Sequence, residues 1–134
     1  MNGSPPIYYI HTSVLLHVVY GDSESAVAWF EGLEPFTALA SSLLRLEAVR
    51  TLRRDGLDPA AADPYLSHVA LFPVDQTVMQ YAEQIQQHVK SPGAIYPATL
   101  MSASPIAILA SHDANLLAAA ATRGISTTDP VSSP

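Results

Sequence analysis

Polar residues at three places in this chain follow or flank segments that a parallel α/β sheet would bring together. His11 directly follows a β-prone run, Ser111 and Asp113 directly follow a second apolar run, and Glu47 lies on a helical segment between them. In open parallel sheets the carboxyl ends of the strands meet at one edge, where free helix amides gather and ligands bind. We therefore expect these side chains to converge, and we expect chemistry at that edge.

The first of these junctions joins a strand to a helix with almost no loop. The residues from Ile7 to Ile10 favour a strand, and they run without a breaker into Thr12 and Ser13, which are strong helix N-caps. An apolar helical pattern then continues to Tyr20 and ends at Gly21. We expect Thr12 and Ser13 to serve first as caps and second as site residues.

The rest of the chain alternates predicted strands and helices. Strands are expected at residues 36–39, 70–74, 106–110 and 125–127. Helices are expected at residues 23–31, 42–54, 77–89, 94–101 and 113–122, with a short helix or turns within 58–69. This order predicts an α/β fold with three layers, in which helices cover both faces of a mostly parallel sheet of four or five strands.

The long helix that ends at Arg54 carries an apolar side and a polar side. Ser41 and Ser42 are its expected N-caps. The predicted core residues are Leu43, Leu46, Val49 and Leu52. Glu47 shares another face with Arg50 and Arg54, so it is open to two interpretations: a site residue, or one partner of a helical salt bridge.

Composition supports one folded domain over residues 1–134, with residues 1–6 and 129–134 expected to be flexible. Apolar residues make up 49% of the chain and charged residues 13%, far from the composition of disordered chains. No apolar run approaches the ~20 residues that a membrane helix needs, and the amino end does not resemble a secretory signal. The sequence contains no cysteine, which fits a reducing compartment. We expect a cytoplasmic protein.

The net charge of −6 argues against a broad electrostatic attraction to nucleic acid. Four of the six cationic residues nevertheless lie on one segment, at Arg45, Arg50, Arg53 and Arg54. An anionic partner would have to dock locally at this segment. The alternative interpretation is a solvated helix face with no partner.

Three phrases of the sequence resemble a known family. They are Ile-Tyr-Tyr-Ile-His-Thr-Ser-Val-Leu-Leu, Ala-Ser-Ser-Leu-Leu-Arg-Leu-Glu-Ala-Val-Arg-Thr-Leu-Arg-Arg and Ile-Leu-Ala-Ser-His-Asp-Ala-Asn-Leu-Leu-Ala-Ala-Ala. In order and spacing they resemble the PIN domain, and especially the VapC-like ribonuclease toxins of bacterial toxin-antitoxin pairs. The resemblance extends from Ile7 to about Thr127.

The resemblance implies cleavage of RNA by water activated on Mg²⁺ or Mn²⁺ ions that acidic residues hold. Such hard cations prefer oxygen ligands, and two of them can stabilise the attacking and leaving oxygens of a phosphodiester. Glu47 and Asp113 match two of the family's catalytic acids. The residues in positions to contact substrate or phosphate are Thr12, Ser13, Ser111 and Arg50.

The chain departs from the family pattern at the other two acids. His11 stands where the family has the acid that ends the first strand. The phrase Pro-Gly-Ala-Ile-Tyr-Pro-Ala-Thr-Leu places Gly93 at the remaining acid and Tyr96 at a histidine, and Pro97 enters the same segment. A unit charge about 4 Å from a divalent ion gains about 8 kcal/mol at an effective dielectric near 20. If about a quarter of this survives desolvation, each lost carboxylate weakens ion binding about 30-fold.

Two functions from different classes follow. In the first, the site is degenerate, catalysis is weak or lost, no metal is required, and partner binding is retained; His11 then only fills a gap and hydrogen-bonds a neighbour. In the second, His11, Glu47 and Asp113 form a rebuilt site for Mn²⁺ or Zn²⁺ in an active ribonuclease, because imidazole suits these ions better than Mg²⁺. A receiver-like or nucleotide-binding domain fits less well, since the first strand lacks an acidic cluster and no phosphate loop follows.

The expected partners are those that the resemblance implies. They are a second copy of the chain in a homodimer, an antitoxin protein and RNA, with no membrane. The remaining histidines show no paired metal spacing and are expected to be ordinary surface or core residues; they are His17, His68, His88 and His112.

Overall fold

The fold is built on one sheet of parallel strands. A computed structural model describes residues 5–73 and 107–132 of the chain. The strands lie in the order β3-β2-β1-β4-β5, and every pairing between them is parallel. Their bounds are β1 Tyr8–Ile10, β2 Ala38–Ser41, β3 Ala70–Phe72, β4 Ile108–Ala110 and β5 Thr127–Thr128.

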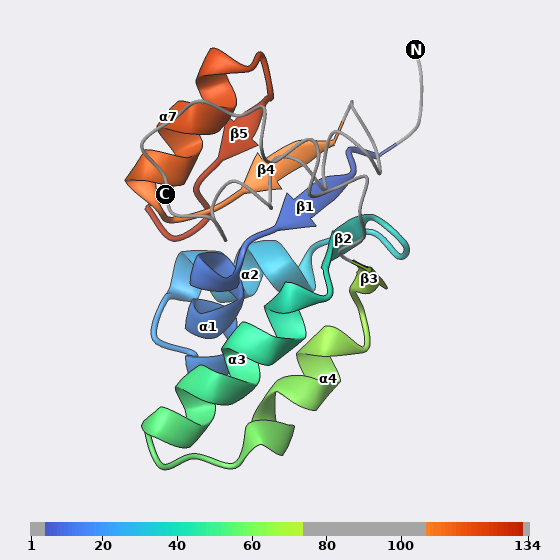
Figure 1. Cartoon of the computed structure of the whole chain (residues 1–134). Coiled ribbons are helices and arrows are strands. Elements are labelled where there is room, and N and C mark those ends of the chain that lie inside the picture. Colours follow the sequence, from blue (N-terminus) through green and yellow to red (C-terminus); the bar gives the residue numbers. More distant parts are fainter. Residues whose placement is uncertain (1–4, 74–106, 133–134) are drawn as a thin grey trace.

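Helices cover both faces of this sheet. Their bounds are α1 Thr12–Tyr20, α2 Glu24–Glu31, α3 Leu43–Arg54, the 3-10 helix η1 Pro59–Ala62, α4 Asp63–Leu66 and α7 Ala114–Thr122. Figure 1 shows α7 on one side of the sheet and α1, α2, α3 and α4 on the other. The expected three-layer α/β/α fold with a parallel sheet is confirmed.

The two faces of the sheet bury separate clusters of side chains. Ile10 lies in the larger cluster with residues of α1, α3 and α4, while its neighbour Tyr9 lies in the smaller cluster with Leu109 and Leu116. This alternation follows from the two-residue period of a strand. Tyr9 is fully buried, and its hydroxyl accepts a hydrogen bond from the Ser41 backbone N–H at 3.1 Å. A central strand buried on both faces is typical of a parallel sheet.

The strand order places a topological switch point beside β1. The chain passes from β1 to β2 and β3 on one side of β1, and then to β4 on its other side. Ile10 is the register partner of Ala110, and the His11 backbone N–H donates to the Ala110 carbonyl at 2.9 Å. The residues that follow β1 and β4 therefore lie next to each other, at the place where open α/β sheets bind ligands.

The second strand begins later than the sequence predicts. Residues 36–39 were expected to form it, but Phe36 is fully exposed and has a φ of +64°, which no extended strand can contain. The strand starts at Ala38 and continues to Ser41. The third strand stops at Phe72 on the edge of the sheet, directly before Pro73, because proline cannot donate to a ladder.

The buried face of α3 also differs from the prediction. Leu46 is 50% exposed, and the buried positions are Leu44, Ala48 and Leu52, which lie four residues apart. The prediction placed the larger side chains of Leu46 and Val49 in the core and left Ala48 out of it. Ser42 has helical backbone angles and makes no capping bond with its side chain; the Ser41 Oγ instead accepts from the Leu43 N–H at 3.2 Å.

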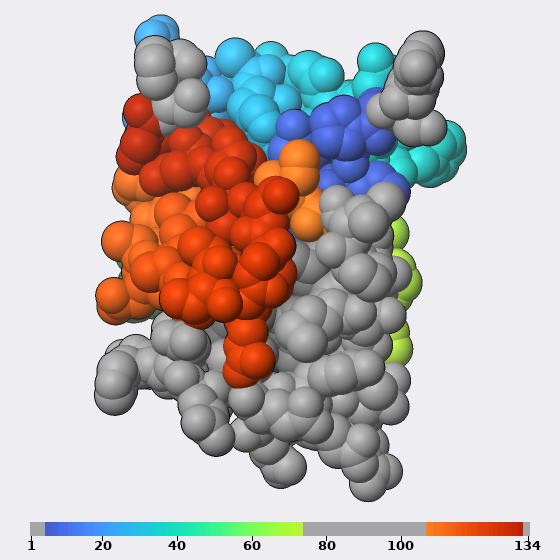
Figure 2. Space-filling view, turned by 90° about the horizontal axis from the view of Figure 1, so that it is seen from above, coloured from blue at the N-terminus to red at the C-terminus, as the bar shows by residue number. Residues whose placement is uncertain are grey.

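The described part of the C-terminal tail packs against α2. Pro130 is buried, and the Ser25 hydroxyl donates to the carbonyl oxygens of Pro130 at 2.7 Å and Val131 at 3.0 Å. Figure 2 shows the red C-terminal residues packed directly against the light-blue region that contains α2. These two hydrogen bonds join residues that are 105 and 106 positions apart in the sequence.

Several expectations lie outside the described residues. These are the helices at 77–89 and 94–101, and with them Gly93, Tyr96 and Pro97. Within residues 5–73 and 107–132, no helix has both the length and the apolar composition required to cross a bilayer.

Candidate functional site

His11 is the N-cap of α1. Its backbone is extended, with φ −86° and ψ 151°, and its side chain accepts a hydrogen bond from the Ser13 N–H. Thr12 and Ser13, which were expected to be the caps, are the first two residues of the helix itself. The imidazole thus takes the capping position because it supplies an acceptor within reach of a free amide at the helix start.

The contacts of His11 define its protonation state. The Ser13 N–H lies 3.3 Å from Nδ1 and can only donate, so Nδ1 carries a lone pair and the ring proton is on Nε2. The Ser13 Oγ lies 2.7 Å from the same nitrogen, as a second donor. Burial lowers the pKa of His11 to about 4, although the charge of Asp113 opposes this shift. His11 is therefore neutral at physiological pH.

Two serines join the junction after β1 to the junction after β4. The Ser13 Oγ accepts from the His112 N–H at 2.8 Å, and the fully buried Ser111 Oγ accepts from the Asp113 N–H at 3.0 Å. The two hydroxyl oxygens lie 3.3 Å apart, and the Ser111 Oγ is also 3.3 Å from the His11 Nδ1. The cluster of His11, Ser13 and Ser111 thus forms one hydrogen-bonded connection between distant segments.

Glu47 reaches the same region from α3. The Thr12 hydroxyl donates to Glu47 Oε1 at 2.7 Å. Burial raises the pKa of Glu47, and the bond from Thr12 and the charge of Arg50 partly oppose this rise. Among the ion pairs of the described residues, none involves Glu47, and Arg54 instead contacts Asp55 at 3.4 Å. The direct hydrogen-bond partner of Glu47 is therefore Thr12, and Arg50 acts on it only through its charge.

Asp113 caps the helix that follows β4. Its Oδ1 accepts from the N–H groups of Asn115 at 2.9 Å and Leu116 at 3.2 Å. The side chain is otherwise exposed. Satisfying two free amides at a helix start is a complete structural role for this carboxylate.

These residues do not assemble a set of metal ligands in the described part of the chain. Residues 5–73 and 107–132 contain no group of three or more histidine, aspartate or glutamate side chains placed to hold one ion. The acceptor nitrogen of His11 faces the Ser13 amide, and an oxygen of Asp113 faces two helix amides. The donors present therefore do not fit the all-oxygen coordination that Mg²⁺ requires.

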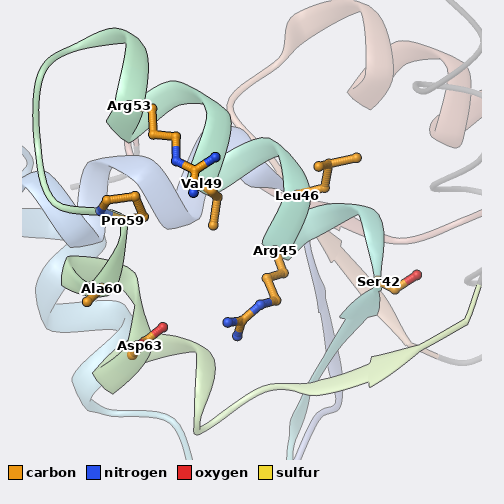
Figure 3. A pocket seen from close by; sticks show the side chains of 8 residues that line it. All are labelled: Ser42, Arg45, Leu46, Val49, Arg53, Pro59, Ala60 and Asp63. Carbon is orange, nitrogen blue, oxygen red and sulfur yellow. The ribbon is translucent and has the colours of Figure 1, made fainter.

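The four arginines of α3 divide into two pairs. Arg50 and Arg54 border an open pocket beside the candidate site, whose other lining residues are His11, Thr12, Glu47 and Thr51. Arg45 and Arg53 border a second pocket, on the side of α3 that faces η1 and α4 (Figure 3). The Arg45 side chain extends into the space between these elements. Of the four arginines of α3, Arg50 and Arg54 are thus the two placed to meet an anion near His11.

Two further pairs of residues near the site were not predicted from the sequence. The His17 Nδ1 lies 2.7 Å from the Asp22 Oδ1, and the His112 Nδ1 lies 3.0 Å from the Asp129 Oδ2. Asp22 follows the end of α1 that carries His17, which is a local signal in the sequence. The second pair joins a helix start to the tail and has no local signal.

Comparison with known proteins gives the fold a context. No protein-family model and no curated protein matches the sequence. A chain of VapBC2 from Rickettsia felis, in a complex bound to a promoter DNA fragment, matches with a TM-score of 0.74 at 11% identity, covering 92% of this chain and 98% of that chain. A chain of a toxin-antitoxin complex from Klebsiella pneumoniae matches with a TM-score of 0.73 at 17% identity, covering 92% and 97%.

The chain has a PIN-like, VapC-type fold. VapC20 from Mycobacterium tuberculosis, a toxin that cleaves the sarcin-ricin loop, shares this fold with a TM-score of 0.68 at 14% identity, covering 84% of this chain and 94% of that chain. At these identities, the similarity to VapC-type proteins concerns the arrangement of the elements.

Proposed function

We propose that this chain is the VapC-like member of a toxin-antitoxin type pair in which the metal site has become a hydrogen-bonded structural junction. Its function is then to bind a partner protein rather than to cleave RNA. The observation that carries this proposal is the capping geometry of His11, whose Nδ1 accepts the Ser13 N–H at the position where the resemblance implies a metal-binding carboxylate.

The neighbouring residues support the same function. Glu47 accepts a hydrogen bond from Thr12, and Asp113 caps α7, so each carboxylate has a structural partner within the chain itself. Gly93 stands at the position where the resemblance implies a further acid. If Mg²⁺ or Mn²⁺ were bound, Glu47 and Asp113 would hold it and the ion would supply an activated water; these two carboxylates alone give it few of the six oxygen ligands it prefers.

The proposed partners are suggested by proteins of similar fold. The similar chains from Rickettsia felis and Klebsiella pneumoniae belong to complexes with antitoxins. For this chain we propose an antitoxin encoded beside it, a homodimer and a cytoplasmic location. A small basic DNA-binding protein encoded next to it is the partner to test first.

Two experiments test this function. Co-expression with the neighbouring small protein is expected to give a complex that survives size-exclusion chromatography. Incubation of the purified chain with structured RNA and Mg²⁺, Mn²⁺ or Zn²⁺ is expected to give no cleavage above that of the Asp113→Asn variant. Metal-dependent cleavage that Asp113→Asn abolishes would contradict the proposal.

A second candidate function rests on the pocket beside α3. It is an active ribonuclease whose rebuilt site uses His11, Glu47 and Asp113, with Arg50 as a phosphate contact from the pocket wall. An Arg50→Gln variant would then lose RNA binding and cleavage together. Under the first proposal, the same variant leaves partner binding unchanged.

A further inference from the structure

Two carboxylate–histidine pairs lie side by side next to the candidate site. The His17 Nδ1 contacts the Asp22 Oδ1 at 2.7 Å, and the His112 Nδ1 contacts both carboxylate oxygens of Asp129 at 3.0 and 3.1 Å. The two imidazole rings meet edge to face, with their centroids 5.5 Å apart. The four residues come from α1, the turn after it, the end of β4 and the tail, so only the fold brings them together.

Hydrogen bonds of the main chain explain why the rings meet. Ser13 and His17 are four residues apart on α1 and therefore share a face of that helix. The Ser13 Oγ accepts the His112 N–H at 2.8 Å, which holds His112 over this face. The tail that carries Asp129 is fastened to α2 through Ser25. The arrangement is thus fixed by contacts that do not involve the rings.

The carboxylates prepare both rings to act as metal ligands. A carboxylate only accepts, so in each neutral ring the proton is on Nδ1 and the lone pair is on Nε2. Carboxylates bonded in this way to ligating histidines orient the ring and increase its basicity in many metal sites. The Ser132 Oγ, 3.4 Å from the His112 Nδ1, is a further polar neighbour.

The separation of the rings matches that of two ligands to one ion. Two imidazoles bound to a tetrahedral ion through bonds of about 2.0–2.1 Å have centroids about 5.2 Å apart. The side chains of His17 and His112 are 34% and 39% exposed, so an ion from solvent can reach them. His17 also lies in the last turn of α1, where the helix dipole favours a positive charge.

We propose that His17 and His112 bind one transition-metal cation of the Zn²⁺ class, with Asp22 and Asp129 as the carboxylates that orient them. Nitrogen ligands favour Zn²⁺, Ni²⁺ and Cu²⁺ over Mg²⁺. Among residues 5–73 and 107–132, no third histidine, aspartate or glutamate is placed to bind the same ion, so the proposed site has two named protein ligands. This site does not use His11, Glu47 or Asp113. Whether it binds Zn²⁺ can therefore be tested independently of RNA cleavage.

Titration calorimetry with ZnCl₂ on the full chain tests this site. One Zn²⁺ is expected to bind per chain, and His17→Asn or His112→Asn is expected to abolish that binding. Asp22→Asn and Asp129→Asn, which leave both ligands in place, are expected to weaken it 10–100-fold. His68→Asn, at an exposed position of the described chain, is the matched control and should bind as the wild type does.

A second measurement separates a metal site from simple ring stacking. Side-chain NMR of the wild type is expected to show the His17 and His112 resonances shifting together with Zn²⁺ while the His11 resonances stay in place. The proposal is overturned if no Zn²⁺ binds, or if binding is equal in the His17→Asn, His112→Asn and His68→Asn variants. Circular dichroism of each variant verifies that the fold is intact.

Discussion

The Nδ1 atom of His11 accepts the backbone N–H of Ser13 at 3.3 Å and lies 2.7 Å from the Ser13 hydroxyl oxygen. This contact caps α1 with a neutral imidazole at the switch point of a parallel sheet. A capping acceptor, unlike a metal-binding carboxylate, needs no negative charge. The relationship therefore explains how the fold accommodates a histidine at this junction, where the resemblance implies an acid.

Stability is expected to fall in acid because of His11. Its pKa is about 4 in the folded protein against 6.5 in the unfolded chain, so the unfolded state binds more protons below pH 6.5. The contribution is complete above pH 6.5 and is lost progressively as the pH falls towards 4, by up to about 3 kcal/mol. Urea unfolding across this range measures it.

The variant His11→Asn isolates the effect, because asparagine keeps a capping acceptor but does not titrate. It is expected to flatten the slope of stability between pH 6.5 and 4. His68→Gln, at an exposed position, is the control and should keep the wild-type slope. An unchanged slope in His11→Asn would show that His11 is not held neutral.

Removal of the buried hydroxyl in Ser111→Ala is expected to destabilise the protein by about 1–3 kcal/mol. The Asp113 N–H would lose its acceptor, and Ser13 would lose a neighbour in the connection between β1 and β4. Denaturant unfolding measures the loss. Ser67→Ala removes an exposed hydroxyl that donates to the Pro64 carbonyl and should cost clearly less; equal losses would refute a special role for Ser111.

The hydroxyl of Thr12 is expected to limit the rise in the pKa of Glu47 that burial causes. Because the bond from Thr12 lowers the pKa of Glu47 against the effect of burial, Thr12→Val should raise that pKa further. Carbon-detected NMR titration of the Glu47 carboxyl measures the shift. Thr51→Val, which alters the same pocket without touching this bond, should leave the pKa where it is.

Asp113 is expected to behave as a helix cap. Asp113→Asn keeps the acceptor for Asn115 and Leu116 and should leave the free energy of unfolding nearly unchanged, whereas Asp113→Ala should cost about 1 kcal/mol. Thermal unfolding of the three proteins gives the comparison. If both variants stabilise the fold, the carboxylate is instead under electrostatic strain, as in a site built for a cation.

The order of strands and helices was predictable because each junction carries a local signal. Short β-prone runs, capping residues and glycines predict β1, α1, α2 and α7 close to where the structure has them. The start of β2 was missed because Phe36 has a left-handed backbone conformation, which a phenylalanine in the sequence does not predict. On α3, Leu52 is buried as predicted, but Leu44 and Ala48 were missed, and a small residue such as Ala48 gives only a weak hydrophobic signal.

The site was predictable in its location and less so in its contacts. Parallel strands require the residues after β1 and β4 to meet, and the structure brings His11, Ser13 and Ser111 within hydrogen-bond distance. Which side chain caps α1 depends on backbone angles, and those place His11 ahead of Thr12. The pairing of His112 with Asp129 depends on the path of the tail, which no local pattern encodes.

The most direct test of a lost metal site is calorimetric titration of Mg²⁺ into the wild type, Asp113→Asn and the double variant His11→Asp with Gly93→Asp. Mg²⁺ is the suitable probe because histidine nitrogens bind it poorly, so His17 and His112 do not contribute. We expect wild type and Asp113→Asn to be indistinguishable and the double variant to gain binding. Tight Mg²⁺ binding by the wild type that Asp113→Asn weakens tenfold or more, or a double variant that gains nothing, would contradict this account.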